Sequence, residues 1–104
     1  MGDVGLGVKR KLLMAKALGF INAIGKLSPS ERSDRPSGTL GQDYNQLRQS
    51  VTELFPDLVP FIPPAVEIGK GLYGGTITSE TNGEIYAFCE QIFQLLEALG
   101  SEGI

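Results

Sequence analysis

A glycine-rich stretch in the second half of the chain has the spacing that most resembles a chemical site. Residues 69–74 read GKGLYG, a GxGxxG pattern, and the strand-like residues 65–68 precede it. In phosphate-binding versions of this pattern, glycines let backbone amides approach the anion and a helix begins directly afterwards. Here the residues that follow Gly74 read GTITSETNG, which predicts no helix before Thr81. We therefore expect a glycine-rich loop or short hairpin at 65–78, and keep phosphate or nucleotide binding through Gly69–Gly74 and Lys70 as a second alternative.

Other reactive side chains are few. The chain has no histidine, so the usual general base and the commonest transition-metal ligand are missing, and hydrolytic triads and most zinc sites go with them. Cys89 falls in the apolar arc of a predicted helix, where a buried neutral thiol is expected. Four carboxylates are expected to form a solvated helix face, since no calcium-type loop accompanies them: Glu80, Glu84, Glu90 and Glu97. We expect no catalytic residue, metal or cofactor, and so no enzyme.

Basic residues gather near the start of the chain, at Lys9, Arg10 and Lys11, with Lys16 and Lys26 beyond them. One interpretation is a solvated helix end whose charges complement the acidic later segments. The other is an interfacial helix on an anionic membrane, because Leu, Phe and Ile lie beside Lys and Arg as such helices require. Nucleic acid is not expected as a partner, since the rest of the chain would repel phosphate.

The composition is that of one small folded domain spanning residues 1–104. The net charge is −3 and the isoelectric point is near 4.8, so no overall field attracts nucleic acid or acidic membranes. A single cysteine cannot form an intrachain disulfide framework, which favours a reducing, cytoplasmic location. The apolar run near the start is too short to span a bilayer.

Three helices are predicted, at roughly 6–27, 40–55 and 82–99. The last is marked by a capping-box pattern, Thr81 with Glu84, and by Gly100 at its end, and its apolar residues share an arc of roughly 160°. The second is expected to open with another capping box, Thr39 with Gln42, and to stop before Pro56. The first is apolar around most of its circumference and needs cover from more than one neighbour. The polar residues 28–38 between the first two are expected to form a solvated loop.

The stretch LFPDLVPFIPPAVEIG, residues 54–69, holds four of the six prolines. It contains a literal PxxP from Pro60 to Pro63, which aromatic grooves recognise when it is exposed. Because it is filled with Phe61, Ile62 and Val66, we expect a stiff, buried crossing segment instead.

Together these patterns predict a mainly α fold, a small bundle of about three helices with a Pro-rich crossing segment. The expected function is a non-enzymatic protein–protein interaction or assembly module, whose partners are a second copy of itself and another protein. Peripheral binding to a membrane surface through Lys9, Arg10 and Lys11 is the first alternative. The apolar faces predict a homodimer or higher oligomer in which the first or last helix pairs with its counterpart, centred on Phe20 and Ile24 or on Phe88 and Ile92.

Overall fold

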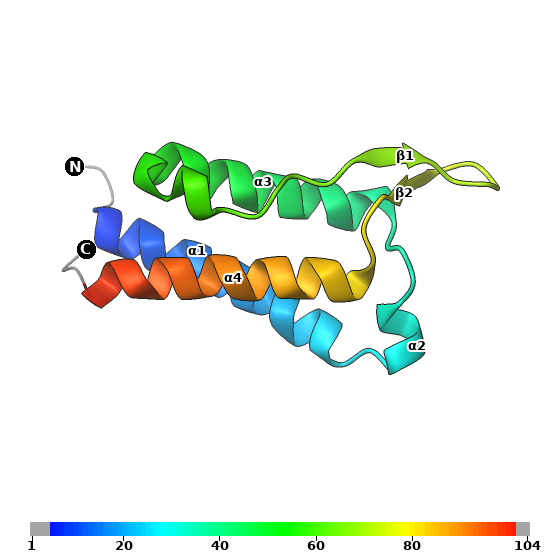
Figure 1. Ribbon diagram of the computed structural model, residues 1–104, viewed down its shortest axis with the longest axis horizontal. Helices are drawn as coiled ribbons and strands as arrows, with labels where there is room; N and C mark the ends of the chain where they lie inside the picture. The colour runs from blue at the N-terminus through cyan, green and yellow to red at the C-terminus, as the bar shows by residue number, and fades with distance from the viewer. Residues whose placement is uncertain (1–4, 102–104) are drawn as a thin grey trace.

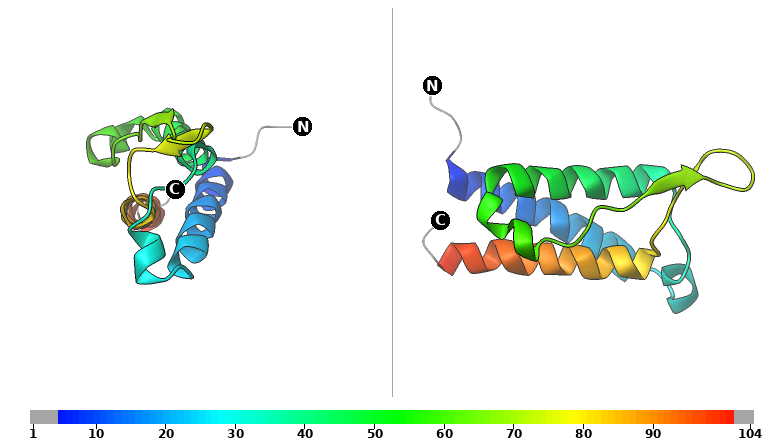
Figure 2. Two further views of the ribbon diagram at one scale, coloured as in Figure 1. Left: turned by 90° about the vertical axis from the view of Figure 1, so that its right-hand side faces the viewer. Right: turned by 45° about the horizontal axis from the view of Figure 1, so that its top comes forward.

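The computed structural model describes residues 5–101 and shows a mainly helical domain. Its long helices are α1 (Leu6–Gly25), α3 (Gly38–Leu54) and α4 (Asn82–Ser101). Helix α1 runs antiparallel to α4 along most of its length, and α3 lies alongside them, running in the same direction as α4 (Figure 1). Viewed along the bundle, the three helices occupy the corners of a triangle (Figure 2). The predicted small bundle is confirmed.

The core lies between the three long helices and the segment that follows α3. Every helix of the triangle contributes fully buried side chains, including Ala17 from α1, Tyr44 from α3 and Ile92 from α4. The rings of Tyr44 and Phe88 pack 5.8 Å apart, which links α3 to α4. The other buried apolar residues are Leu13, Ile24, Leu47, Val51, Phe55, Leu58, Val66, Ile85, Cys89 and Leu96.

Helix α4 begins as its sequence predicts. The backbone amide of Thr81 donates to Glu84 Oε1 at 3.0 Å, and the amide of Glu84 donates to Thr81 Oγ1 at 3.2 Å. This reciprocal pair satisfies two amide groups that a helix start otherwise leaves without acceptors. The capping box predicted from these two residues is therefore confirmed.

The start of α3 differs from the prediction. The helix begins at Gly38 with Ser37 as its N-cap, and no side chain caps it, so the expected Thr39–Gln42 capping box is wrong. Ser37 instead forms a β-bridge with Ile77 of the hairpin, and Thr78 Oγ1 donates to the Ser37 carbonyl at 2.8 Å. Pairing with a distant strand fixes this helix start in place of a local cap.

The segment 28–38 is not a plain loop. It contains a short helix, α2 (Pro29–Arg32), whose own capping box joins Ser28 and Glu31. Arg32 connects this turn to its neighbours: its guanidinium donates to the Gly25 carbonyl at 2.7 Å and lies 5.6 Å from the centre of the Tyr86 ring. The residues of α2 are otherwise exposed, as the polar composition predicts.

The Pro-rich stretch forms the 3₁₀ helix η1 (Pro56–Phe61) followed by an extended segment that returns along α3 (Figure 2). Side chains of α3 hold this segment: Tyr44 donates to the Pro64 carbonyl at 2.9 Å and Arg48 donates to the Pro63 carbonyl at 2.8 Å. It is a connector, as expected, and Val66 is buried. Phe61, however, is 60% exposed, so its predicted burial is wrong. It is the last residue of η1, where the backbone faces the bundle instead of the ring: the Phe61 carbonyl accepts a hydrogen bond from Gln91 of α4 at 3.3 Å.

Candidate interaction surface

The GxGxxG stretch forms the end of a β-hairpin that projects beyond the helices (Figure 1). Strands β1 (Ile68–Lys70) and β2 (Thr76–Thr78) pair antiparallel, and the Gly71 amide donates to the Gly75 carbonyl at 3.2 Å. Gly74 and Gly75 have φ angles of 87° and 67°, in the left-handed region that favours glycine. The glycines therefore serve a chain reversal, and no helix N-terminus follows them to stabilise an anion.

Two apolar side chains occupy the tip of this hairpin. Leu72 and Tyr73 are fully exposed, beside the cation Lys70. Their neighbours on both sides are glycines, so nothing in the hairpin itself covers them. Large apolar side chains presented at the end of a projecting hairpin form a compact surface that suits insertion into another molecule.

The other candidate reactive groups lie apart from one another. Cys89 is a free, fully buried thiol on α4, and burial raises its pKa to about 12, so it is neutral at physiological pH. Of the four carboxylates, Glu84 serves the helix cap and Glu80 accepts a hydrogen bond from Ser79. Within residues 5–101, no three His, Cys, Asp or Glu side chains come together in a way that could hold a metal ion.

The fold places the three residues of the basic cluster near the chain start in different environments. Arg10 is buried, and its guanidinium donates to the Leu96 carbonyl at 2.9 Å and contacts Met14 Sδ at 3.0 Å. Lys9 is half-buried and Lys11 is exposed. Two of the three expected anion contacts thus remain at the surface, while the third joins α1 to the end of α4.

The four side chains expected at the centre of an interface also differ in how far the fold buries them. Ile24 and Ile92 are buried in the core of the single chain, where α1 packs on α4. Phe88 is half-buried and stacks on Tyr44. Phe20 is half-buried and borders a surface hollow, so it is the member of the set that lies at an open surface.

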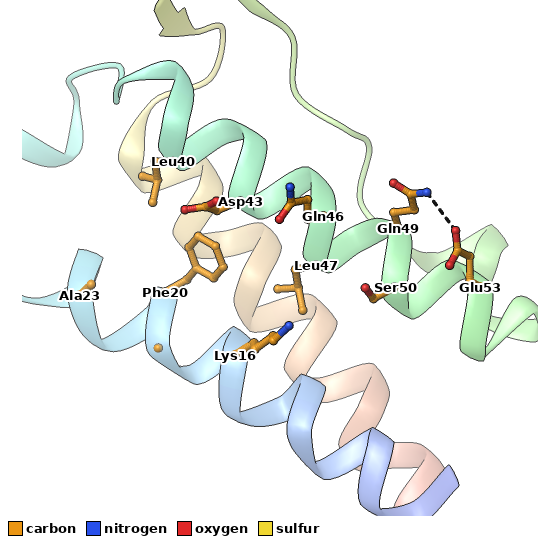
Figure 3. A pocket seen from close by; sticks show the side chains of 11 residues that line it. Lys16, Phe20, Ala23, Leu40, Asp43, Gln46, Leu47, Gln49, Ser50 and Glu53 are labelled. Carbon is orange, nitrogen blue, oxygen red and sulfur yellow. Dashed lines mark hydrogen bonds between the residues drawn. The ribbon is translucent and has the colours of Figure 1, made fainter. Parts of the chain in front are cut away.

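That hollow is part of a groove between α1 and α3. Its larger part has a volume of about 720 Å³, and Phe20 of α1 and Leu47 of α3 lie between the two helices there (Figure 3). A second hollow of about 480 Å³ continues toward the start of α1 and shares Lys16 and Ser50 with the first. We call the two together the α1–α3 groove. Its lining residues are Lys9, Leu12, Leu13, Ala15, Lys16, Gly19, Phe20, Ala23, Leu40, Asp43, Gln46, Leu47, Gln49, Ser50, Glu53 and Leu54.

The two walls of the groove differ in chemistry. The α3 wall contains three leucines but is mainly polar. It carries the carboxylates Asp43 and Glu53, the latter accepting a hydrogen bond from Gln49 at 2.9 Å (Figure 3). The α1 wall combines Lys16 with apolar and small residues, and Leu12 is 57% exposed on it. The groove thus offers an apolar strip flanked by opposite charges.

The exposed side of α1 was not singled out by sequence reasoning. Val8, Leu12, Ala15 and Gly19 are all exposed, and their spacing of four, three and four residues places them on one face of the helix. The spacing itself is visible in the sequence. Because α1 also has an apolar face toward α4, the pattern alone could not show which face the fold would leave open.

None of the helices within residues 5–101 is both long enough and apolar enough to cross a membrane. Comparison of the chain with protein-family models, with curated proteins and with solved structures finds no match.

Proposed function

We propose that this protein is a non-enzymatic assembly module that associates with itself and with another protein. The α1–α3 groove is the observation that carries the proposal. Helix α1 turns one apolar face to α4 and leaves a second, containing Val8 and Leu12, uncovered beside this groove. An uncovered apolar strip next to a groove of this size is typical of a surface that another protein covers.

The hairpin tip supports a second contact in the same module. Leu72 and Tyr73 are fully exposed between the paired strands β1 and β2. The hairpin that these strands form projects beyond the ends of the helices (Figure 2). Tyrosine is enriched among the residues that dominate binding energy, because its ring buries a large apolar area and its hydroxyl can form a hydrogen bond. We assign this tip to the other protein partner.

The proposal includes a cytoplasmic setting. Cys89 is a buried free thiol, the state that a reducing compartment preserves.

Light scattering of the purified chain over a range of micromolar concentrations tests the proposal. We expect a mass of at least twice the 11.1 kDa of one chain. A mass of 11.1 kDa at every concentration would remove self-association from the function. A parallel series with Tyr73→Ser should give the same mass as the wild type, because the tip is assigned to a different partner.

A membrane surface is the second candidate. The exposed side chains Leu6, Val8 and Leu12 adjoin Lys9 and Lys11 on the same turns of α1, a combination that suits the interface of an anionic bilayer. Sedimentation with vesicles containing phosphatidylserine tests it, with neutral vesicles as the control. Binding to the anionic vesicles that weakens as salt rises would support this candidate, whereas equal behaviour with both kinds of vesicle would dismiss it.

A further inference from the structure

We propose that the occupant of the α1–α3 groove is α1 of a second copy, with the two α1 helices antiparallel across a two-fold axis. In this arrangement Leu12 of each copy fills the hollow over Gly19 of the other. The inference deepens the proposed self-association and rests on it. It specifies the orientation of the two helices, and this orientation can be wrong even if the chain does self-associate.

The first argument is the shape of the exposed face of α1. At 100° per residue, Val8, Leu12, Ala15 and Gly19 fall within roughly 60° of the helix circumference. Leu13 and Ala17, which pack in the core, lie on the other side. Spacings of four and three residues along a narrow strip suit contact with one further helix, as in coiled coils. The face is thus built for a single helical partner.

The second argument is the order of side-chain sizes along this face. Its large residues, Val8 and Leu12, precede its small ones, Ala15 and Gly19, and Ala23 follows one turn later beside the same face. No heavy atom of a neighbouring group lies within 4 Å of a Cβ atom built on Gly19, so the space above it is open. An antiparallel pair places large on small at both ends, Leu12 over Gly19 and Val8 over Ala23. A parallel pair would place Leu12 on Leu12 and leave a void between the glycines, which close packing disfavours.

The third argument is charge. Asp43 lies on the α3 wall in the part of the groove that Gly19 and Ala23 line. In the antiparallel pair, this part receives the beginning of the second α1, which carries Lys9 and Lys11. Lys9 lines the groove, on the side of α1 that faces α3. The opposite charges therefore favour the same orientation as the side-chain sizes, and the symmetry repeats the contact at the other end.

Cysteine cross-linking tests the orientation. In the proposed register residue 15 lies next to the two-fold axis, so Ala15→Cys should form a disulfide with its own counterpart under mild oxidation. The matched control is Asn22→Cys, also exposed on α1. Its two copies would lie about 20 Å apart along the helices, well beyond the reach of a disulfide. The native Cys89 is fully buried and does not compete.

We expect most of the Ala15→Cys chains to run as a dimer on a non-reducing gel and almost none of the Asn22→Cys chains. Circular dichroism of both variants verifies that each is folded. Equal cross-linking of both variants would indicate parallel helices and overturn the inference. An oligomeric wild type whose Ala15→Cys variant does not cross-link would also overturn it, but would leave the proposed self-association intact. A wild type of 11.1 kDa would contradict both.

A charge exchange provides an independent readout in solution. Asp43→Lys should weaken association by roughly threefold to tenfold, because it places like charges next to Lys9 of the second copy. Adding Lys9→Glu to the same chain should restore most of the loss. Weakening without restoration would contradict the proposed contact between these two residues.

Discussion

Arg10 near the start of α1 donates a hydrogen bond at 2.9 Å to the carbonyl of Leu96, which lies 86 positions later in the sequence. The guanidinium also lies against the backbone of Gly100, where an added Cβ atom would come within 2.9 Å of it. A cation here faces the negative end of the α4 dipole. The contact joins the beginning of the first helix to the end of the last.

Replacing Arg10 with methionine keeps much of the apolar stem and removes the hydrogen bond and the charge. We expect Arg10→Met to lower the free energy of unfolding by about 1–3 kcal/mol, because a buried charge-assisted hydrogen bond is lost. Urea unfolding at one fixed protein concentration measures the change. The matched control is Arg35→Met, since Arg35 is exposed, and it should change stability by less than about 0.5 kcal/mol. Equal losses of stability in the two variants would show that Arg10 does not hold α1 to α4.

Asn45 holds the Pro-rich connector to α3 through a pair of hydrogen bonds. Its side-chain amide donates to the Val66 carbonyl and its Oδ1 accepts from the Val66 amide, both at 2.9 Å. Asn45→Ala should therefore cost about 1–3 kcal/mol, because both backbone groups of Val66 lose their partner. Gln42→Ala, on an exposed position of the same helix, is the control. A cost for Asn45→Ala no larger than that of the control would mean that the connector is held by its apolar contacts alone.

Gly41 allows the hairpin to lie directly on α3. A Cβ atom at this position would overlap the Thr78 hydroxyl and lie 3.1 Å from Ile68 Cδ1. Gly41→Ala should thus destabilise the fold by about 1–3 kcal/mol, although alanine is the better helix former. Gly25→Ala is the matched control, because its added Cβ would make ordinary contact with Tyr86 at 3.6 Å. In thermal unfolding, Gly25→Ala should be at least as stable as the wild type. A Gly41→Ala variant more stable than the wild type would refute the close approach of the hairpin to α3.

Two buried acids make the fold sensitive to alkali. Burial raises the pKa of the Cys89 thiol to about 12 from an ordinary value of 9.0, and burial also raises the pKa of Tyr44. Each raised pKa means that the folded state holds its proton more tightly than the unfolded state. Stability is therefore complete below pH 9 and declines above it, by up to about 1.4 kcal/mol per pH unit for each group that titrates.

Thermal unfolding between pH 7 and pH 11 measures this decline. Cys89→Ala should be less stable than the wild type at pH 7, because it loses buried volume, but should lose less stability between pH 9 and pH 11. Parallel pH profiles for the two proteins would mean that the thiol does not contribute to the alkaline loss.

The sequence predicts best where the signal is local. Thr81 and Glu84 bind each other's backbone across one helical turn, so the start of α4 can be read from four residues. The start of α3 cannot, because Ser37 pairs with Ile77, a strand residue far along the chain. The Thr39–Gln42 pattern is locally just as good, but the long-range pairing takes precedence.

The candidate surface shows the same limit. Periodicity indicates that α1 is apolar on more than one side. The structure shows which side is covered: Ile24 is buried where α1 packs on α4, and Leu12 stays exposed. Arg10 belongs by sequence to a basic cluster, yet the fold buries it against Leu96. The position of α4 determines which apolar face of α1 is covered and which cation is buried. No local sequence pattern gives that position.

Sedimentation equilibrium of the wild type beside Gly19→Leu tests the central claim, that copies of this chain associate through the α1–α3 groove. Leucine at position 19 should stabilise α1, since it is a better helix former and no neighbour lies within 4 Å of its Cβ, but it fills the hollow that a second copy would enter. We predict a wild-type mass of about twice 11.1 kDa and a folded Gly19→Leu chain of 11.1 kDa. Equal masses for the two proteins, whether monomeric or oligomeric, would contradict the account.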